Sequence, residues 1–356
     1  MCAAGQLLWV GVDKAVVHQA GACLVNAVWD LWSKIADLPL WRLVSTLPPE
    51  VLCSAVPLWD LEDELTKAEA LELLEDRDAA AKIEKVLAAG VPAYTTATGW
   101  SGYGDDKVKG LIAAAKAKGF DSFKMKVGLG LDRDCERAAL IRGEIGPEGT
   151  LMMDANSVWS VPTAISSMRV LAKFNVSWIE EPIHCDDILG HLAIQKEMDE
   201  LGIAVAGGEQ TVNRVMMKQY LSSGAYKVCQ QDAVKCAGLN EWLAICLMAK
   251  KRGVPMAVHT GGVGLCQMGL HLGAIDLVRG GGERKGGLNK VEYITSLEEM
   301  FVEPVTVSGG CYRVSEGAGW GLDLKQNVLA MYEYPSGGFW KDKGGWFDEA
   351  GRPGVN

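Results

Sequence analysis

The sequence predicts an α/β fold, specifically a (β/α)₈ TIM-type barrel. From about residue 92, eight short strand-like runs alternate with longer helical segments at intervals of roughly 25–30 residues. The predicted strands end in ionisable residues, and barrels carry their chemistry at those strand ends. A doubly wound open sheet is the alternative. However, "GGVGLCQMG" and "GLGLDR" both lack the G-x-G-x-x-G spacing, and no Walker A sequence occurs.

The segment before the barrel is predicted to be mainly helical. Residues 14–45 place small and apolar residues at helical spacing up to a break at Pro39, which predicts a buried helix pair. Residues 60–90 carry opposite charges at helical spacing, which predicts one or two solvated helices. We therefore expect three parts, which are residues 1–91 (mainly helical), 92–300 (the barrel) and 301–356 (a C-terminal segment that packs back on the rest).

The eight strands are predicted from short apolar runs bounded by turn residues. They cover residues 92–98, 122–127, 150–156, 176–182, 203–209, 226–232 and 255–260, and the last one lies within 275–295. The segments between them, for example 105–119 and 239–253, end in Lys and Gly as helices commonly do.

Composition excludes several classes of protein. The net charge of −10 argues against a nucleic-acid-binding or anionic-membrane surface, because both need clustered Lys and Arg. The ten cysteines form no C-x-x-C pair, which indicates reduced thiols rather than a disulfide or zinc framework. We find no signal peptide and no run long enough to span a bilayer, so we expect a cytoplasmic protein.

Ionisable residues stand at successive predicted strand ends. In chain order they are Lys124 and Lys126, Asp154, Glu180 and Glu181, Glu209, Asp232, His259 and Glu292. A closed barrel would bring all of them to one mouth. Because residues i and i+2 of a strand face the same side, the two lysines point together, and we expect the carboxylates to lie opposite them.

Three of these residues, Asp154, Glu180 and Glu209, come from adjacent strands and form a hard-oxygen set that suits Mg²⁺. Alternatively, each of them pairs separately with a Lys or Arg of a neighbouring helix. We choose Glu180 over Glu181 because side chains alternate along a strand, so that one enters the mouth and the next points away.

The remaining strand-end residues suit general acid and base catalysis. The positive charge of Lys124 disfavours protonation of Lys126, as a general base requires, and Lys124 can also hold a substrate carboxylate. Asp232 and His259 would be an orienting carboxylate and a titratable imidazole on the opposite side. Taken alone, His259 would more often be structural, as we expect the other four histidines to be.

These motifs together resemble the mandelate racemase group of the enolase superfamily. Lys-x-Lys on the second strand is followed by "DAN", "WIEEP", "GGEQ", "QQDAVK" and "VHTGGVGL". Longer stretches such as "PAYTTATGWSGYGDD" and "LMAKKRGVPMAVHTGGVGL" resemble the L-fuconate dehydratase branch, which has fungal relatives that act on L-galactonate. The resemblance covers nearly the whole chain.

The resemblance implies a Mg²⁺-dependent hydro-lyase that dehydrates a sugar acid of the L-fuconate or L-galactonate type. The product would be a 2-keto-3-deoxy sugar acid, formed through an enediolate. Lys126 would remove the α-proton, and His259 would protonate the departing 3-hydroxyl. The implied metal ligands are Asp154, Glu180 and Glu209; the catalytic residues are Lys124, Lys126, Asp232, His259 and Glu292; and the substrate-binding residues are Lys124, Asn156 and Glu292.

Two alternatives stay open at this stage. One is a 2-hydroxy-acid racemase or epimerase that uses the same Lys126 and His259. The other is a catalytically impaired metal-binding barrel, because relatives carry an α+β cap over the barrel mouth and this chain is expected to have a truncated N-terminal capping domain. We expect a small-molecule substrate and neither a nucleic-acid nor a membrane partner; a homo-oligomer is left open.

Overall fold

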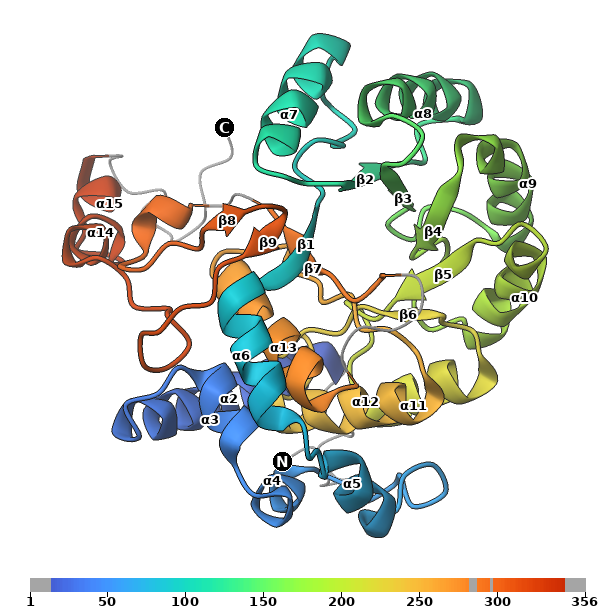
Figure 1. Cartoon of the computed structure of the whole chain (residues 1–356). Coiled ribbons are helices and arrows are strands. Elements are labelled where there is room, and N and C mark those ends of the chain that lie inside the picture. Colours follow the sequence, from blue (N-terminus) through green and yellow to red (C-terminus); the bar gives the residue numbers. More distant parts are fainter. Residues whose placement is uncertain (1–13, 282–286, 295–296, 343–356) are drawn as a thin grey trace, which may run out of the picture.

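The computed structural model describes residues 14–281, 287–294 and 297–342, and its centre is a ring of parallel strands (Figure 1). The strands are β1 (Val91–Thr95), β2 (Ser122–Lys126), β3 (Thr150–Asp154), β4 (Val176–Glu180), β5 (Ala204–Gly207), β6 (Val228–Cys229) and β7 (Val291–Tyr293). Strands β1 to β6 pair in chain order, and β7 pairs with β1 in parallel.

An extended segment between β6 and β7 occupies the eighth position of the ring. It joins β6 through a single isolated bridge between Met256 and Cys229, so the strand predicted for residues 255–260 is much shorter than expected. Backbone hydrogen bonds nevertheless continue on both sides. The N–H of Ala257 donates to the carbonyl of Cys229 (2.8 Å), and the N–H of Glu292 donates to the carbonyl of Val258 (3.0 Å). The predicted closed barrel is therefore confirmed.

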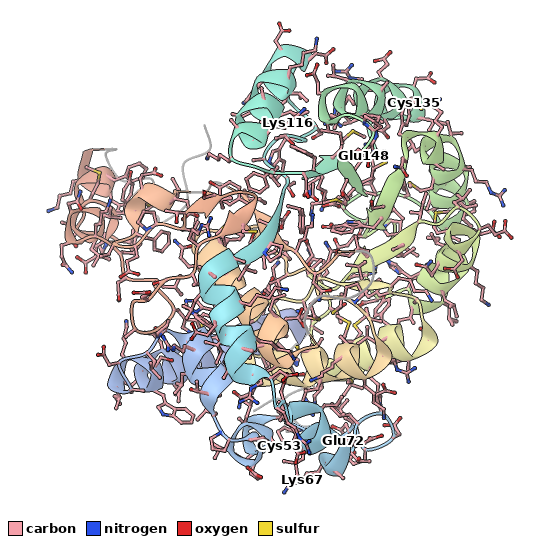
Figure 2. All side chains as sticks on the ribbon, viewed as in Figure 1. Cys53, Lys67, Glu72, Lys116, Cys135 and Glu148 are labelled. Carbon is pink, nitrogen blue, oxygen red and sulfur yellow. The ribbon has the colours of Figure 1, made fainter. Side chains whose placement is uncertain are left out.

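Helices surround the ring. They are α7 (Asp105–Ala117), α8 (Leu131–Ile145), α9 (Val161–Leu171), α10 (Ile188–Asp199), α11 (Arg214–Ser223), α12 (Leu239–Arg252) and α13 (Leu265–Arg279), with a short 3₁₀ turn η1 (Ala172–Phe174) after α9. Side chains fill both the inside of the ring and the space between the ring and the helices (Figure 2). Both helices that were predicted from their Lys- and Gly-rich ends, α7 and α12, are present.

The inside of the ring contains an apolar layer. Its buried members are Tyr94, Met152, Trp178, Ala206, Val228 and Ala257. Met152, Trp178 and Ala257 stand two residues before Asp154, Glu180 and His259, respectively, on the same face of the backbone. Asp154, Glu180 and His259 therefore lie directly above this layer, toward the carboxyl ends of the strands, whereas Lys124 and Glu292 are in register with Met152 and Tyr94 of the layer itself.

The N-terminal part is helical, with α2 (Lys14–Ile35), α3 (Leu40–Thr46), α4 (Pro49–Ala55), α5 (Lys67–Leu74) and α6 (Ala79–Ala89). The predicted break is confirmed, because Pro39 is the N-cap of α3. The expectation of a buried pair holds for α3 but is wrong for the outer face of α2. There Leu24, Val28 and Ile35 are 61%, 64% and 75% exposed, since α2 packs on α3 and α12 from one side only.

After β7 the chain forms a 3₁₀ turn, η2 (Glu298–Met300), and a short hairpin of β8 (Val307–Ser308) and β9 (Cys311–Tyr312) that pairs antiparallel with β1. Helices α14 (Gln326–Tyr332) and α15 (Gly338–Asp342) follow. The N–H of Trp320 donates to Asp30 of α2 (2.8 Å), which connects this segment to the N-terminal helices. Among the described residues, no helix is both long and apolar enough to cross a membrane, and the nine cysteines there form no disulfide bond with one another.

Candidate active site

Three of the predicted site residues lie in one row across adjacent strands. The register pairs Lys126 of β2 with Asp154 of β3, and Asp154 with Glu180 of β4. These residues end their strands, so their side chains leave the apolar layer at the carboxyl side of the barrel. The regular spacing of these residues in the sequence thus corresponds to a lysine and two carboxylates that lie side by side on neighbouring strands.

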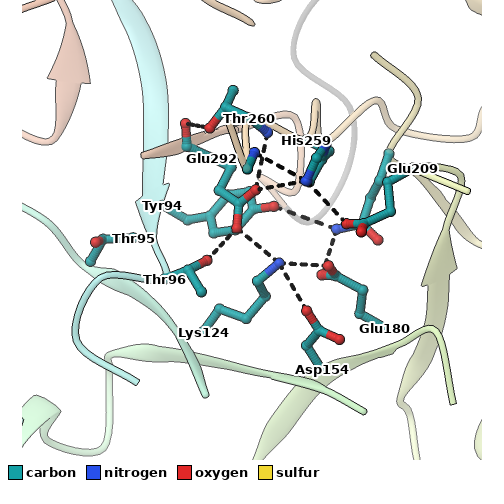
Figure 3. A network of polar contacts seen from close by, with 12 residues as sticks. Tyr94, Thr95, Thr96, Lys124, Asp154, Glu180, Glu209, His259, Thr260 and Glu292 are labelled. Carbon is teal, nitrogen blue, oxygen red and sulfur yellow. Dashed lines mark hydrogen bonds and ion pairs between the residues drawn. The ribbon is translucent and has the colours of Figure 1, made fainter. Parts of the chain in front are cut away.

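Lys124 lies at the centre of the polar cluster (Figure 3). Its side chain is 1% exposed, and its Nζ lies 2.5 Å from Oε1 of Glu180, 2.9 Å from Oε1 of Glu292 and 3.4 Å from Oδ2 of Asp154. Lys126 is slightly more accessible, and its Nζ lies 2.5 Å from the same Oδ2 of Asp154. The structure therefore places carboxylates directly against both lysines.

The buried carboxylates influence one another strongly. Burial and the charge of Asp154 raise the pKa of Glu180 well above its ordinary value, although Lys124 opposes this. Burial also acts to raise the pKa of Asp154, but the charges of Lys124 and Lys126 hold it below the ordinary value. Glu209, which is 8% exposed in the loop after β5, adds a further negative charge that acts on Glu180.

Glu181 joins this cluster, contrary to the expectation that it points away. The strand ends at Glu180, and Glu181 has a φ of 39°, so the alternation of an extended strand stops there. Its side chain is 2% exposed, and its Oε1 has no hydrogen-bond partner. Burial and the charges of Glu209 and Asp154 raise its pKa to about 8.

The donor chemistry of this cluster fits Mg²⁺, because carboxylate oxygens are the ligands that this ion prefers and a divalent cation relieves repulsion among buried carboxylates. The fit rests on the type of ligand atom and not on short distances between the carboxylates. Among the described residues, the group with three ligand atoms within 4.8 Å of one another is His184, Cys185 and Asp186 in the loop after β4. The carboxylates of Asp154, Glu180 and Glu209 form no such tight set.

His259 and Asp232 are in direct contact. Nδ1 of His259 lies 2.8 Å from Oδ2 of Asp232, while the other oxygen of Asp232 accepts the backbone N–H groups of Val234 (2.8 Å) and Lys235 (2.7 Å). Nε2 of the ring lies 3.3 Å from Oε2 of Glu209. Burial lowers the pKa of His259, but Glu209 and the bond to Asp232 outweigh it and raise the pKa to about 10. The ring is therefore oriented by one carboxylate and directed at the cluster.

Of the three residues expected to bind the substrate, Lys124 has been described above, and Glu292 and Asn156 are placed differently from each other. Glu292 of β7 is 1% exposed and accepts hydrogen bonds from the hydroxyl of Thr96 and the N–H of Thr260. Burial opposes its ionisation, but Lys124 and His259 lower its pKa to about 2. Asn156 is exposed, and the structure brings only its backbone to the cluster, where its N–H donates to Oδ1 of Asp154 (2.9 Å).

Sequence reasoning missed Gln230, which is fully buried at the end of β6. Its Nε2 donates to Oε2 of Glu180 (2.6 Å), and the indole N–H of Trp178 approaches the same oxygen (3.3 Å). The signal was available, because Gln230 precedes Asp232 by two residues and therefore shares its face of the backbone.

The chain matches one protein-family model and several characterised proteins. The model described as "Enolase C-terminal domain-like" matches residues 108–328. Mitochondrial enolase superfamily member 1 of Bos taurus is 43% identical over 95% of this chain and 76% of its own length. L-galactonate dehydratase of Hypocrea jecorina is 42% identical over 93% of this chain and 74% of its own length.

Solved structures agree with this result. The crystal structure of human mitochondrial enolase superfamily member 1 matches with a TM-score of 0.89 and 42% identity, covering 95% of this chain and 77% of that chain. L-talarate/galactarate dehydratase from Salmonella typhimurium, solved with Mg and L-lyxarohydroxamate, matches with a TM-score of 0.68 and 26% identity, covering 91% of this chain and 69% of that chain.

Proposed function

The chain belongs to the enolase superfamily, and on this basis we propose that it is a Mg²⁺-dependent hydro-lyase that dehydrates a sugar acid of the L-galactonate or L-fuconate type. One observation carries the proposal. Lys126 on β2 and His259 on the segment after β6 face the same carboxylate cluster from strands that are not neighbours in the ring. Dehydration needs a base for the α-proton and an acid for the leaving hydroxyl, and this arrangement supplies both.

Asp154, Glu180 and Glu209 would hold the Mg²⁺. The bound ion would supply positive charge that stabilises the negative charge developing on the substrate carboxylate. Lys124 keeps Glu180 and Asp154 in place through its ion pairs, and Gln230 orients the second oxygen of Glu180. Buried hydrogen bonds of this kind fix the direction of metal-binding carboxylates.

Lys126 would take the α-proton of the substrate at its Nζ, and Asp154 limits the positions that this Nζ can adopt. His259 would donate a proton from Nε2 to the departing 3-hydroxyl, because Nδ1 is held by Asp232. In the structure the backbone N–H of Gly261 lies 3.0 Å from this Nε2, so the ring has to leave that contact to act as the acid. The backbone N–H groups of Val234 and Lys235 hold Asp232 still, so the imidazole keeps one orientation during the transfer.

A product assay tests the proposal. The protein is incubated with Mg²⁺ and L-fuconate, L-galactonate, D-arabinonate or L-rhamnonate, and 2-keto-3-deoxy acid is measured by colour. We expect product from at least one acid, and its loss with EDTA or in Lys126→Ala but not in the exposed-lysine control Lys196→Ala. The absence of product from every acid in a folded protein would overturn the proposal. Deuterium exchange at C2 without keto product would favour the racemase alternative.

The domain boundaries and the compartment are proposals of the same kind. We propose residues 92–300 as the barrel unit, residues 1–91 as part of a cap, and residues 301–356 as a segment that packs back on both. We also propose the cytoplasm as the compartment, because the described cysteines form no disulfide bond with one another, although the bovine and human proteins reported above carry "mitochondrial" in their names. Subunit assembly is a separate question, which size-exclusion chromatography with light scattering answers.

A further inference from the structure

Arg137 of α8 reaches the base-bearing end of β2 from outside the ring. The residue is 3% exposed, although it carries a charge. Its Nη1 donates to the carbonyl of Lys126 (2.5 Å), and its Nη2 donates to the carbonyls of Gly99 (2.9 Å) and Trp100 (3.1 Å). One guanidinium therefore joins the strand end that carries the proposed base to the loop after β1.

The loop after β1 is pressed against β2 at this point. The N–H of Lys126 donates to the carbonyl oxygen of Gly99 (2.9 Å). This oxygen therefore accepts hydrogen bonds from both Lys126 and Arg137. A Cβ atom on Gly99 would lie 2.1 Å from the carbonyl oxygen of Lys124, so no larger residue fits without moving the strand. The main chain at Lys126 is thus held by several bonds beyond the ordinary strand pairing.

Trp100, the next residue of that loop, faces the side chain of Lys126. Its ring centroid lies 5.4 Å from Nζ, within the range of a cation–π contact, and the residue is 39% exposed. Because Nζ also contacts Asp154, the amine is held between an aromatic face and a carboxylate. Asp134 lies three residues before Arg137 on the same helix. It accepts a hydrogen bond from the N–H of Gly128 (2.8 Å) and so holds the turn that follows β2.

We propose that Arg137 and Trp100 are positioning residues for Lys126, an inference that rests on the proposed role of Lys126 as the base. Arg137 fixes the main chain of Lys126 and the loop that carries Trp100, and Trp100 restricts where the Nζ of Lys126 can point. Neither residue transfers a proton. Displacing a catalytic group by about 1 Å can cost on the order of 10²-fold in rate, so such a restraint matters for turnover.

A merely structural role is the competing explanation, and the chain offers a matched control for it. Arg142 lies on the same helix, and its guanidinium also donates to backbone carbonyls, including those of Phe174 (2.9 Å), Gly146 (2.8 Å) and Asn175 (2.9 Å). It has no contact with β2 among these bonds. For Trp100 the control is Trp32 of α2, which is 37% exposed.

The experiment compares Arg137→Gln and Trp100→Leu with Arg142→Gln and Trp32→Leu in the full chain with Mg²⁺. The first readout is the kinetics of keto-acid formation, given as kcat and KM. The second is the rate at which a pulse of acetic anhydride acetylates Lys126, measured by peptide mass spectrometry. We expect kcat to fall on the order of 10²-fold in the first pair with little change in KM, and labelling of Lys126 to rise severalfold. In the control pair neither readout should change, even if Arg142→Gln unfolds at lower urea. Added guanidinium should restore part of kcat in Arg137→Ala.

The two readouts separate this inference from the proposed function. If the wild type forms no keto acid, the proposed function fails, and the labelling comparison alone decides whether Arg137 and Trp100 position Lys126. If the wild type is active but the first pair matches the control pair in both readouts, the inference is overturned and the function stands. Should Arg137→Gln fail to fold, Trp100→Leu decides in the same way.

Discussion

Lys124 of β2 and Glu180 of β4 form a fully buried ion pair across β3, the strand that lies between them. Nζ of Lys124 on β2 lies 2.5 Å from Oε1 of Glu180 on β4, and both side chains are at most 1% exposed. The same ammonium contacts Glu292 and Asp154, so one positive charge is shared among three carboxylates. Burial acts against the charge of Lys124, but these neighbours hold its pKa well above the ordinary value.

Replacing Lys124 by Met is therefore expected to destabilise the fold strongly. Removing one partner of a buried ion pair costs about 3–5 kcal/mol, and here Asp154 and Glu292, whose pKa values Lys124 helps to lower, would stay charged and buried without it. Urea denaturation in EDTA measures the loss. The control is Lys34→Met, which removes partly exposed ion pairs with Asp30 and Asp323 and should cost about 1 kcal/mol. Equal losses of unfolding free energy in the two variants would show that the buried pair contributes no more to stability than the surface pairs.

Gln230 is expected to control metal affinity without binding the metal. Its amide holds Oε2 of Glu180 (2.6 Å), and loss of such an outer hydrogen bond typically weakens metal binding by about 10–100-fold. Gln230→Leu should therefore need more Mg²⁺ to reach the same thermal stabilisation, measured as the shift in Tm across a Mg²⁺ titration. Gln219→Leu, at an exposed position of α11, is the control. An unchanged titration midpoint in Gln230→Leu would contradict this role.

The alignment of the site could be predicted from the sequence because it depends on two regular properties. Side chains two residues apart share a face of a strand, and the carboxyl ends of parallel strands meet at one side of a barrel. Lys126, Asp154 and Glu180 therefore appear in one row, as their spacing indicated. Direct contact between Asp232 and His259 follows from the same regularity.

The parts that could not be predicted depend on local departures from that regularity. Glu181 turns into the cluster because its φ is 39°, and a glutamate gives no sign of such a conformation in the sequence, since positive φ is otherwise found mainly at Gly, Asn and Asp. The segment at residues 255–260 keeps only one bridge to β6, although its composition is typical of a strand. The exposed apolar face of α2 shows the same limit, since helical periodicity indicates which residues are apolar but not whether anything packs on them.

Lys126 and His259 are expected to act on different bonds, and solvent exchange separates their roles. In D₂O, His259→Asn should still exchange the C2 proton of the substrate through Lys126 but should form keto acid on the order of 10²–10⁴-fold more slowly. Lys126→Ala should lose both reactions. Exchange is followed by proton NMR and product by the keto-acid assay. If His259→Asn lost exchange as completely as Lys126→Ala, the assignment of separate acid and base would be wrong.

Glu181 provides a prediction about the pH dependence of stability. Burial and the charges of Glu209 and Asp154 raise its pKa in the folded protein to about 8, above the ordinary value of an unfolded glutamate. The unfolded chain therefore releases this proton first, and the stability that comes from keeping Glu181 neutral is present at low pH and lost as pH rises toward about 8. In EDTA, Glu181→Gln should come close to the wild type near pH 4.5 and exceed it by roughly 4–5 kcal/mol in unfolding free energy at pH 8, which is about 1.4 kcal/mol for each unit of pKa shift. Urea denaturation at several pH values measures the difference, with Glu148→Gln at an exposed position as control. A difference that does not change with pH would mean that the Glu181 carboxyl ionises as easily in the folded protein as in the unfolded chain.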